Sequence, residues 1–159
     1  RGPENVWGSA ATGCSLALLS CFWPNYLSIF MVGFASSFAS KLSDTFSSEI
    51  GKRFGRSTFL ITTLKLVKPG TEGAVSLEGS LAGLSGSFIM TAVMLKLSII
   101  SNIDVAIIVF VSGCVATILE SYIGAVIQNK LEWLTNELVN AIQTSLAAIL
   151  SMLLYNFFI

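Results

Sequence analysis

Charged residues are scarce in this sequence. They make up 11% of its 159 residues, against 53% that are hydrophobic, and the mean hydropathy is +0.78. Soluble domains carry about 25% charged residues, so this composition leaves too few charges for a water-facing surface. It also excludes intrinsic disorder, which needs low hydrophobicity and a high net charge. The composition therefore predicts an integral membrane protein whose surroundings are the lipid bilayer.

Histidine is absent and cysteine is rare. Without histidine, the chain has no histidine-based acid–base catalysis, no histidine metal site and no serine–histidine triad. The cysteines Cys14, Cys21 and Cys114 form no CxxC pair and lie in apolar surroundings, so we expect small buried hydrophobic residues. Nine basic and nine acidic residues give a net charge of zero, which argues against a nucleic-acid partner.

Long stretches without charge predict about five membrane segments. No charged residue occurs between positions 5 and 40, and Pro24-Asn25 supplies a break, so we expect segments at 9–23 and 26–40, as a tight hairpin, tilted spans or partly re-entrant pieces. Three later stretches, 79–103, 105–129 and 138–159, hold at most one charge each and are long enough to span a bilayer. The predicted fold class is an all-α, polytopic transmembrane helical bundle forming a single transmembrane domain over residues 1–159.

One basic polar loop, residues 41–78, separates the second and third segments. Residues 41–76 hold six of the nine basic residues and three acidic ones, a net charge of +3. The positive-inside rule places this loop on the cytoplasmic or stromal side together with Arg1 and Lys130, and only Lys96 falls toward the other side. A second linker, 128–137, carries Trp133, a residue that suits a membrane interface.

The first half of the loop combines carboxylates with basic residues. Its polar side chains are Lys41, Asp44, Thr45, Ser48, Glu49, Lys52 and Arg56. Helical spacing puts the first four on one face, with Glu49 one turn after Thr45. Carboxylates with few other ligands suit Mg²⁺, which keeps several waters and takes further ligands from substrate phosphates. Lysine and arginine suit the phosphates themselves. We therefore expect a metal site at Asp44 and Glu49 beside a phosphate site.

The second half of the loop contains two glycine turns. Its candidate residues are Lys65, Lys68, Gly70, Thr71, Glu72, Gly73, Ser76 and Glu78. Pro69-Gly70 marks a turn, and Gly73 permits close approach of the backbone to a ligand. A helix starting at Ser76 presents free N–H groups to an anion. A Walker A motif is absent, and the alternative reading is that a basic loop is only a topology signal and a Pro-Gly pair only a turn.

Polar residues also occur within the predicted spans. Glu120 is a candidate functional residue because an ionisable side chain in a bilayer is costly; the alternative is a protonated or hydrogen-bonded packing residue. Asn136 and Asn140 lie one turn apart and either share a polar pocket or merely start the last helix. A row of small residues, which we expect to pack helices within the chain, consists of Gly79, Gly83 and Gly86.

Two motifs in the loop resemble a known family. They are SDTFSSEIGK at 43–52 and PGTEGAVSLEG at 69–79, and the resemblance continues in RGPENV at 1–6, ESYIGA at 120–125 and WLTNELVN at 133–140. The sequence resembles an integral membrane family catalogued as a domain of unknown function, and within it the phytyl-phosphate kinases of plastids and cyanobacteria. Comparison with that family implies that residues 1–159 are the C-terminal part of a longer member.

The loop is more distantly similar to membrane enzymes that use CTP, the phosphatidate cytidylyltransferases and the polyprenol kinases. Their glycine–basic motif corresponds to GKRFGR at 51–56, and their Lys-Ser-x-Glu-Gly-Ser-like motif to SLEGS at 76–80. The lysine of the second motif is Val75 here, which leaves Lys65 and Lys68 as candidates for its role.

The resemblance implies the reaction. Phytyl phosphate and a nucleoside triphosphate, with CTP as the implied donor, give phytyl diphosphate for tocopherol and phylloquinone synthesis. The implied cofactor is Mg²⁺ at Asp44 and Glu49, with Glu78 as a third candidate ligand. Phosphate contacts are then expected from Lys52, Arg56, Lys65 and Lys68, and a backbone cradle from Gly70, Thr71 and Gly73. The implied location is the plastid envelope or a cyanobacterial membrane.

Three alternatives stay open at this point. The chain is another CTP-dependent lipid kinase or cytidylyltransferase, a transporter that uses Glu120 as an ion or proton carrier, or a non-catalytic packing subunit of a membrane complex. The choice of nucleotide, the specificity for the prenyl chain and the oligomeric state do not follow from the residues.

Overall fold

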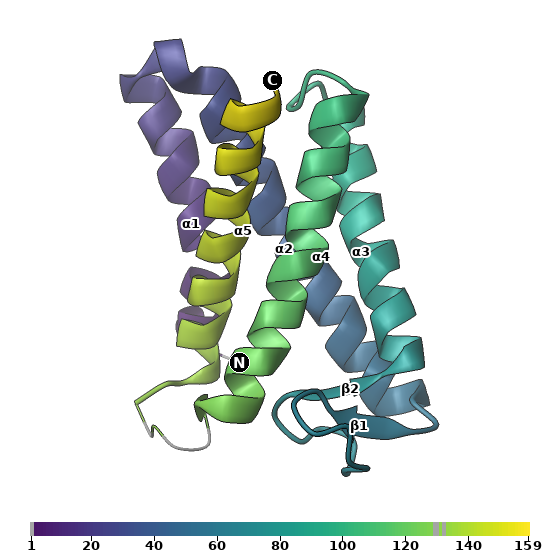
Figure 1. Cartoon of the computed structure of the whole chain (residues 1–159). Helices are drawn as coiled ribbons and strands as arrows, with labels where there is room; N and C mark the ends of the chain where they lie inside the picture. The colour runs from purple at the N-terminus through teal and green to yellow at the C-terminus, as the bar shows by residue number, and fades with distance from the viewer. Residues whose placement is uncertain (1, 129–130, 132) are drawn as a thin grey trace.

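A computed structural model describes residues 2–128, 131 and 133–159 of the chain. Five α-helices, one short 3-10 helix and two short strands follow one another in this part of the chain (Figure 1). The helices are α1 (Pro3–Phe22), α2 (Leu27–Phe54), α3 (Leu77–Lys96), α4 (Ile103–Val126) and α5 (Asn136–Phe158); η1 (Pro24–Tyr26) joins α1 to α2, and β1 (Thr58–Leu60) and β2 (Ala74–Ser76) join α2 to α3.

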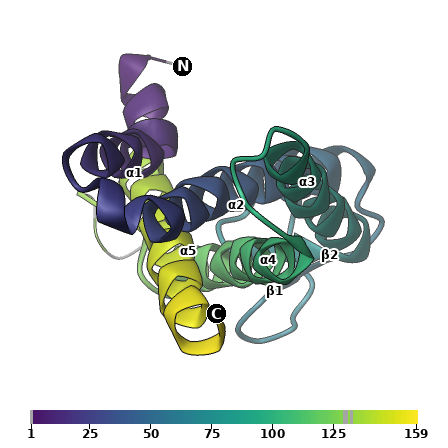
Figure 2. The same ribbon diagram turned by 90° about the horizontal axis from the view of Figure 1, so that it is seen from above.

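Helix α2 is the centre of the bundle. It packs against α1, α3, α4 and α5, and the view from above shows α1 and α5 toward one side of it and α3 and α4 toward the other (Figure 2). The strands lie at the end of the bundle that holds the N-terminus, and the C-terminus lies at the opposite end (Figure 1). The main hydrophobic core joins α2, α3 and α4 through residues such as Val32, Ala39, Met94 and Val109.

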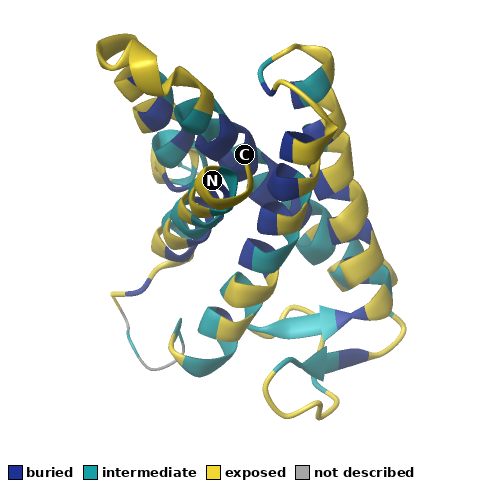
Figure 3. Ribbon diagram, turned by 45° about the horizontal axis from the view of Figure 1, so that its top comes forward, coloured by how far each residue is buried: buried dark blue, intermediate teal, exposed yellow. Residues whose placement is uncertain are grey.

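Small polar side chains share the interior of the bundle with the hydrophobic core, and large apolar side chains lie outside. Ser36, Ser87 and Ser112 are fully buried, whereas Phe157 is 80% exposed. Figure 3 shows exposed residues along the outer sides of the helices. One exposed apolar stripe on α3 consists of Leu77, Leu81, Leu84 and Phe88. Small polar residues inside and large apolar residues outside are what helices need when their solvent is lipid.

Three helices, α3, α4 and α5, are long and apolar enough to cross a membrane. Helix α1 has 20 residues and α2 has 28, lengths of about 30 Å and 42 Å at about 1.5 Å per residue, but neither meets the hydropathy and charge criteria that the other three meet. The break predicted at Pro24-Asn25 is confirmed by η1. The all-helical bundle is confirmed in outline, and its reading as five membrane segments stays a prediction.

Several predicted boundaries differ from the structure. Helix α1 begins six residues before position 9, and α3 ends at Lys96 instead of 103. The end of α3 is set by Ser98, which has φ +56° and donates its N–H to Leu95 O, while the Ile99 N–H donates to Met94 O, both at 3.0 Å. This is a Schellman cap, which glycine usually provides, so the sequence did not mark it. In the 128–137 linker, Lys130 and Glu132 lie outside the described residues.

The predicted polar loop at 41–78 is largely structured. Its first part is the last half of α2, which continues to Phe54, and the rest holds the antiparallel pair β1–β2, with Phe59 opposite Val75. Only helices were expected from the sequence, so this short sheet is an addition to the predicted helical bundle. A physical reason is the run Thr58-Phe59-Leu60-Ile61, whose β-branched and aromatic side chains favour extended backbone.

Glycines bring α3 directly onto α2. A Cβ atom added at Gly86 would lie 2.7 Å from Leu42 O, and one added at Gly79 would lie 2.8 Å from Ser47 O. The small-residue row thus packs within the chain, as predicted. The expectation of buried cysteines was wrong for Cys14 and Cys21, which are exposed on α1; Cys114 is half-buried.

Candidate functional site

A polar cleft of about 590 Å³ opens at the end of the bundle that carries the strands. Six parts of the chain meet there: the start of α1, the second half of α2, Thr58 of β1, the segment 69–76, the last turns of α4 and the start of α5. Its lining includes Asn5, Ser9, Lys41, Asp44, Thr45, Ser48, Glu49, Lys52, Thr58, Gly70, Thr71, Glu72, Gly73, Val75, Ser76, Glu120, Ser121, Asn136 and Asn140. Residues from both halves of the predicted 41–78 loop therefore face the same cleft as Glu120 of α4 and the two asparagines of α5.

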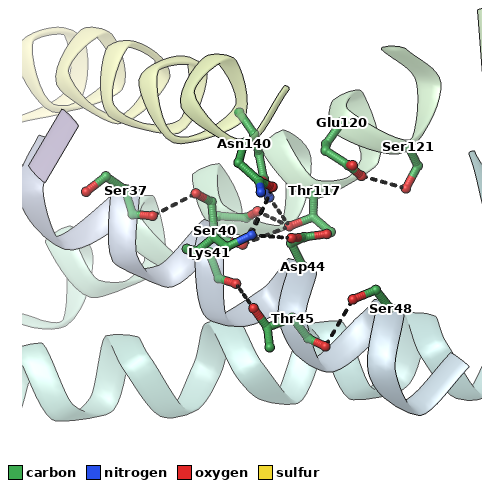
Figure 4. Close-up of polar contacts among 12 residues, drawn as sticks. Ser37, Ser40, Lys41, Asp44, Thr45, Ser48, Thr117, Glu120, Ser121 and Asn140 are labelled. Carbon is green, nitrogen blue, oxygen red and sulfur yellow. Dashed lines mark hydrogen bonds and ion pairs between the residues drawn. The ribbon is translucent and has the colours of Figure 1, made fainter. Parts of the chain in front are cut away.

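Lys41 is the polar centre of the cleft. Its Nζ donates to Asp44 Oδ2 at 2.7 Å, one turn along α2, and to Asn140 Oδ1 at 2.9 Å on α5 (Figure 4). The Lys41 and Asp44 side chains are 21% and 14% exposed, so the ion pair is mostly shielded. Of the three N–H bonds of the ammonium, two are engaged, which leaves one for a ligand. Sequence reasoning placed Lys41 on the polar face but gave it no role, although its i, i+3 spacing to Asp44 was a usable signal.

Glu120 adds a carboxylate from α4. Its Oε2 accepts a hydrogen bond from Ser121 at 3.4 Å, and the charges of Asp44, Glu72 and Lys41 act on it. The predicted intramembrane residue therefore belongs to the cleft. Asn140 is buried and also lines the cleft, and Asn136 lines it at the first turn of α5.

The cleft carries more acidic than basic side chains. Four carboxylates line it, against two ammonium groups; they are Asp44, Glu49, Glu72 and Glu120, against Lys41 and Lys52. A surplus of carboxylates repels a bare phosphate, and a divalent cation removes that repulsion. The described residues contain no cluster of three or more acidic or cysteine side chains arranged as a metal cage. Separate carboxylates without a cage fit Mg²⁺, which is held by one or two carboxylates, waters and substrate phosphates.

The hydroxyl groups on α2 are engaged by their own helix. Thr45 Oγ1 donates to Lys41 O at 2.9 Å, and Ser48 Oγ donates to Thr45 O at 3.3 Å. Both residues line the cleft, where each oxygen can still accept a hydrogen bond. Ser76 is the N-cap of α3 and accepts from the Gly79 N–H at 3.1 Å, so its predicted anion-binding position is already used as a cap.

The segment 69–73 forms one wall of the cleft. Gly70 and Gly73 have φ of +89° and +72°, and Thr71 Oγ1 donates to Lys68 O at 2.8 Å. The turn predicted here is confirmed. The close approach expected at Gly73 is also present, but the partner is α4 and not a ligand: a Cβ atom at this position would lie 2.6 Å from Ser121 O and would collide with Ala125.

Four predicted residues do not line the cleft. They are Lys65, Lys68, Arg56 and Glu78. Strand β1 explains the displacement of Lys65, because β1 pairs with β2 on one side and with the Lys65–Val67 segment on the other. The cleft is bordered by β2 and by Thr58 at the start of β1, and not by the Lys65–Val67 segment. Glu78 accepts a hydrogen bond from the Arg56 backbone N–H at 3.4 Å on the outer surface.

Other cleft residues had no sequence signal. Asn5 and Ser9 lie one turn apart on α1, Thr58 comes from β1, and Ser121 neighbours Glu120. Each is an ordinary polar residue, and only the packing of the helices brings it to the cleft.

Comparison with known proteins finds a family model and several relatives that match this chain. Residues 1–148 match the family described as "Integral membrane protein DUF92". The chain is 48% identical over 153 residues to an uncharacterized membrane protein of Synechocystis sp. (96% of the chain, 59% of the relative). It is 46% identical over 162 residues to the chloroplastic protein VTE6 of Arabidopsis thaliana (99% and 48%) and 32% identical over 155 residues to an uncharacterized membrane protein of Methanocaldococcus jannaschii (98% and 63%).

The chain thus spans about half to two thirds of the length of these relatives. No solved structure matches it. The membrane location and the family resemblance expected from the sequence are both confirmed. This protein chain belongs to the integral membrane protein family DUF92.

Proposed function

We propose that this chain carries the phosphoryl-transfer site of a membrane kinase that converts phytyl phosphate to phytyl diphosphate. The observation that carries the proposal is the Lys41 ammonium held between Asp44 and Asn140 in an otherwise acidic cleft. Two matches support it: the loop motifs resemble phytyl-phosphate kinases, and relatives occur in a cyanobacterium and, as a chloroplastic protein, in a plant. We place the protein in a plastid or cyanobacterial membrane.

The reaction joins two phosphates. An oxygen of the lipid phosphate attacks the terminal phosphorus of the nucleoside triphosphate, the bond from that phosphorus to the bridging oxygen breaks, and the nucleoside diphosphate leaves. The attacking oxygen is already ionised at neutral pH, so no general base and no histidine are needed. Catalysis then consists of positioning and charge stabilisation.

Lysines in the cleft are the proposed phosphate ligands. Lys41 has one N–H bond to offer, and the Lys52 side chain lies over the 69–73 segment, 3.9 Å from the Cβ position of Gly70. In the Lys-Ser-x-Glu-Gly-Ser-like motif of the CTP-using enzymes, the lysine position is Val75 in this chain. We propose that Lys41 and Lys52, and not Lys65 or Lys68, take the role of that lysine. Gly70 and Glu72 line the same wall, whereas the Thr71 N–H is already donated to Lys68 O at 3.2 Å and Gly73 packs on α4.

Carboxylates are the proposed ligands of Mg²⁺. Asp44 and Glu49 keep the role expected from the sequence, and Glu120 and Glu72 are close enough to share it. When bound, the cation neutralises charge on the phosphates. CTP is the proposed donor because of the more distant similarity of the loop to CTP-using enzymes.

The phytyl chain would lie among the helices, whose outer surfaces are apolar. This arrangement explains why a phosphoryl-transfer site is built at the end of a membrane bundle: the lipid tail stays in hydrocarbon while its phosphate reaches the polar cleft.

The test is a product assay with the full-length protein in membranes. Phytyl phosphate and Mg²⁺ are supplied with CTP, UTP, ATP or GTP, and products are identified by mass. Phytyl diphosphate that forms with one nucleotide, and is lost when Asp44→Asn is introduced, supports the proposal. A CMP-bearing lipid and pyrophosphate would instead indicate a cytidylyltransferase, and folded protein without any product would contradict the kinase function.

A further inference from the structure

A second polar layer lies in the bundle one turn from the cleft. It consists of Ser40 on α2, Thr117 on α4 and Gln143 on α5, which are 0%, 8% and 0% exposed. Gln143 is the largest of the fully buried side chains in the described part of the chain. A buried amide is costly unless it is hydrogen-bonded, and leucine of similar size would be favourable at this depth. The presence of glutamine here therefore requires an explanation.

The layer converges on one backbone carbonyl. Gln143 Nε2 donates to Ser40 O at 3.1 Å and to Thr117 Oγ1 at 3.3 Å. Thr117 Oγ1 lies 3.3 Å from Ser40 O as well as 3.0 Å from Gly113 O, and Figure 4 shows Thr117 beside Ser40. Helical geometry also assigns Ser40 O to the N–H of Asp44. Helices α4 and α5 thus each place a side chain within hydrogen-bond distance of the Ser40 carbonyl, which lies at the start of the turn from Lys41 to Asp44.

On each of the three helices, the residue of this layer lies within one turn of a residue that lines the cleft. Ser40 directly precedes Lys41 and lies one turn before Asp44. Thr117 lies one turn before Glu120 on the same face of α4, and Gln143 lies one turn after Asn140 on the same face of α5. Each helix therefore contributes one residue to the layer and a neighbouring residue to the cleft, so a shift of one helix in the layer displaces its side chain in the cleft.

We infer that Gln143 and Thr117 are positioning residues, which fix the Lys41–Asp44 turn relative to Glu120 and Asn140 through the Ser40 carbonyl. This inference rests on the proposed function, because it assigns the layer to the phosphoryl-transfer site. Neither residue lines the cleft. Their effect is on geometry: a misplacement of about 1 Å in a reacting site can cost 100-fold in rate.

The experiment compares four variants of the full-length protein in lipid nanodiscs. Gln143→Leu removes the amide that donates to Ser40 O. Thr117→Val removes the hydroxyl that accepts from Gln143 and shares its one proton between Ser40 O and Gly113 O, and Thr117→Ser keeps that hydroxyl. The matched control is Thr144→Val, because Thr144 is equally buried on α5 but bonds to Thr12 of α1 and to Ala141 of its own helix. We expect Gln143→Leu and Thr117→Val to lower kcat at least tenfold with little change in KM for the nucleotide. Thr117→Ser and Thr144→Val should stay within about threefold of the unmodified protein.

A residue that only fills space would behave differently. Leucine fills the volume of Gln143, so packing alone predicts normal kcat and equal or greater thermal stability for Gln143→Leu; that result would overturn the inference. A combined Gln143→Leu/Thr117→Val variant should lose no more than about threefold beyond the worse single variant, since both act on one carbonyl. If Gln143→Leu fails to fold, the contrast between Thr117→Val and Thr117→Ser decides.

Mn²⁺ binding, followed by electron paramagnetic resonance, separates this inference from the proposed reaction. We expect Gln143→Leu and Thr117→Val to weaken Mn²⁺ binding about tenfold, because Asp44 and Glu120 lose their alignment. Unmodified protein that binds Mn²⁺ but makes no phytyl diphosphate would refute the proposed function alone. Mn²⁺ affinity that is equal in Gln143→Leu, Thr117→Val and the unmodified protein would refute the positioning role.

Discussion

Replacing Gly73 with alanine should detach one wall of the cleft from α4. Two costs add at this position. Its φ of +72° costs an L-residue about 1–2 kcal/mol. The new methyl group would also lie 2.6 Å from Ser121 O and collide with Ala125, and overpacking of this kind costs about 1–3 kcal/mol. The sum of about 2–5 kcal/mol corresponds to roughly a 30- to 4,000-fold greater opening of the segment.

The matched control is Gly70→Ala. Gly70 also has positive φ, +89°, but an added Cβ would meet only Lys52 Cε at 3.9 Å, so only the backbone cost of about 1–2 kcal/mol remains. The difference between the two variants therefore isolates the contact with α4.

Hydrogen exchange read by mass spectrometry measures the opening. Two protected amides report on it: the Ile61 N–H donates to Gly73 O and the Ala74 N–H donates to Thr71 O, both at 3.0 Å. We expect much faster exchange of both amides in Gly73→Ala than in Gly70→Ala. Equal exchange in the two variants would refute the packing of this segment against α4.

Three further predictions concern turnover. Asp44→Asn keeps the shape of the side chain but removes its charge, so we expect at least a 100-fold loss of Mg²⁺-dependent kcat, with chelation of Mg²⁺ having the same effect on the unmodified protein; normal turnover would refute the metal role. Lys52→Ala should lower kcat/KM for the nucleotide at least tenfold, whereas Lys65→Ala should change it less than about twofold. A larger loss in Lys65→Ala than in Lys52→Ala would instead support the role expected for Lys65 from the sequence. Asn140→Leu removes an acceptor 2.9 Å from the Lys41 ammonium, and the loss of about 1.5 kcal/mol predicts a roughly tenfold lower kcat/KM, measured in the same assay; an unchanged value would exclude Asn140 from the site.

The helices were predictable because charge and hydropathy mark them directly. The charge-free run at 138–159 became α5 with its start two residues earlier, and the break at Pro24-Asn25 became η1. The end of α3 was not predictable, since a serine takes the left-handed position where glycine is the usual marker. Local signals thus fix the existence of helices better than their ends.

The site was predictable where one helix carries it. Asp44, Thr45 and Ser48 share a face of α2 by spacing alone, and all three line the cleft. Lys65 and Lys68 do not line the cleft, because their position depends on which neighbours β1 takes, and no local sequence pattern records this long-range pairing. Lys65 lies beyond β1 and Lys52 lies over the cleft wall, although both belong to the same basic stretch.

Glycine contacts join helices on both sides of α2. Backbone approaches at Gly79 and Gly86 tie α3 to α2, and the hairpin is connected to these two helices at its ends. On the other side, Gly8 brings α1 onto the backbone of Glu137, and Thr12 hydrogen-bonds to Thr144 and Ser145 in the middle of α5.

The cleft lies where these helices meet, and the Lys41–Asn140 hydrogen bond joins α2 to α5 there. Helices whose backbones touch resist sliding past one another, so the side chains around the cleft are held at fixed spacings. Because the Lys41 ammonium bonds both to Asp44 on its own helix and to Asn140 on α5, any change in the spacing of these two helices acts directly on that one group.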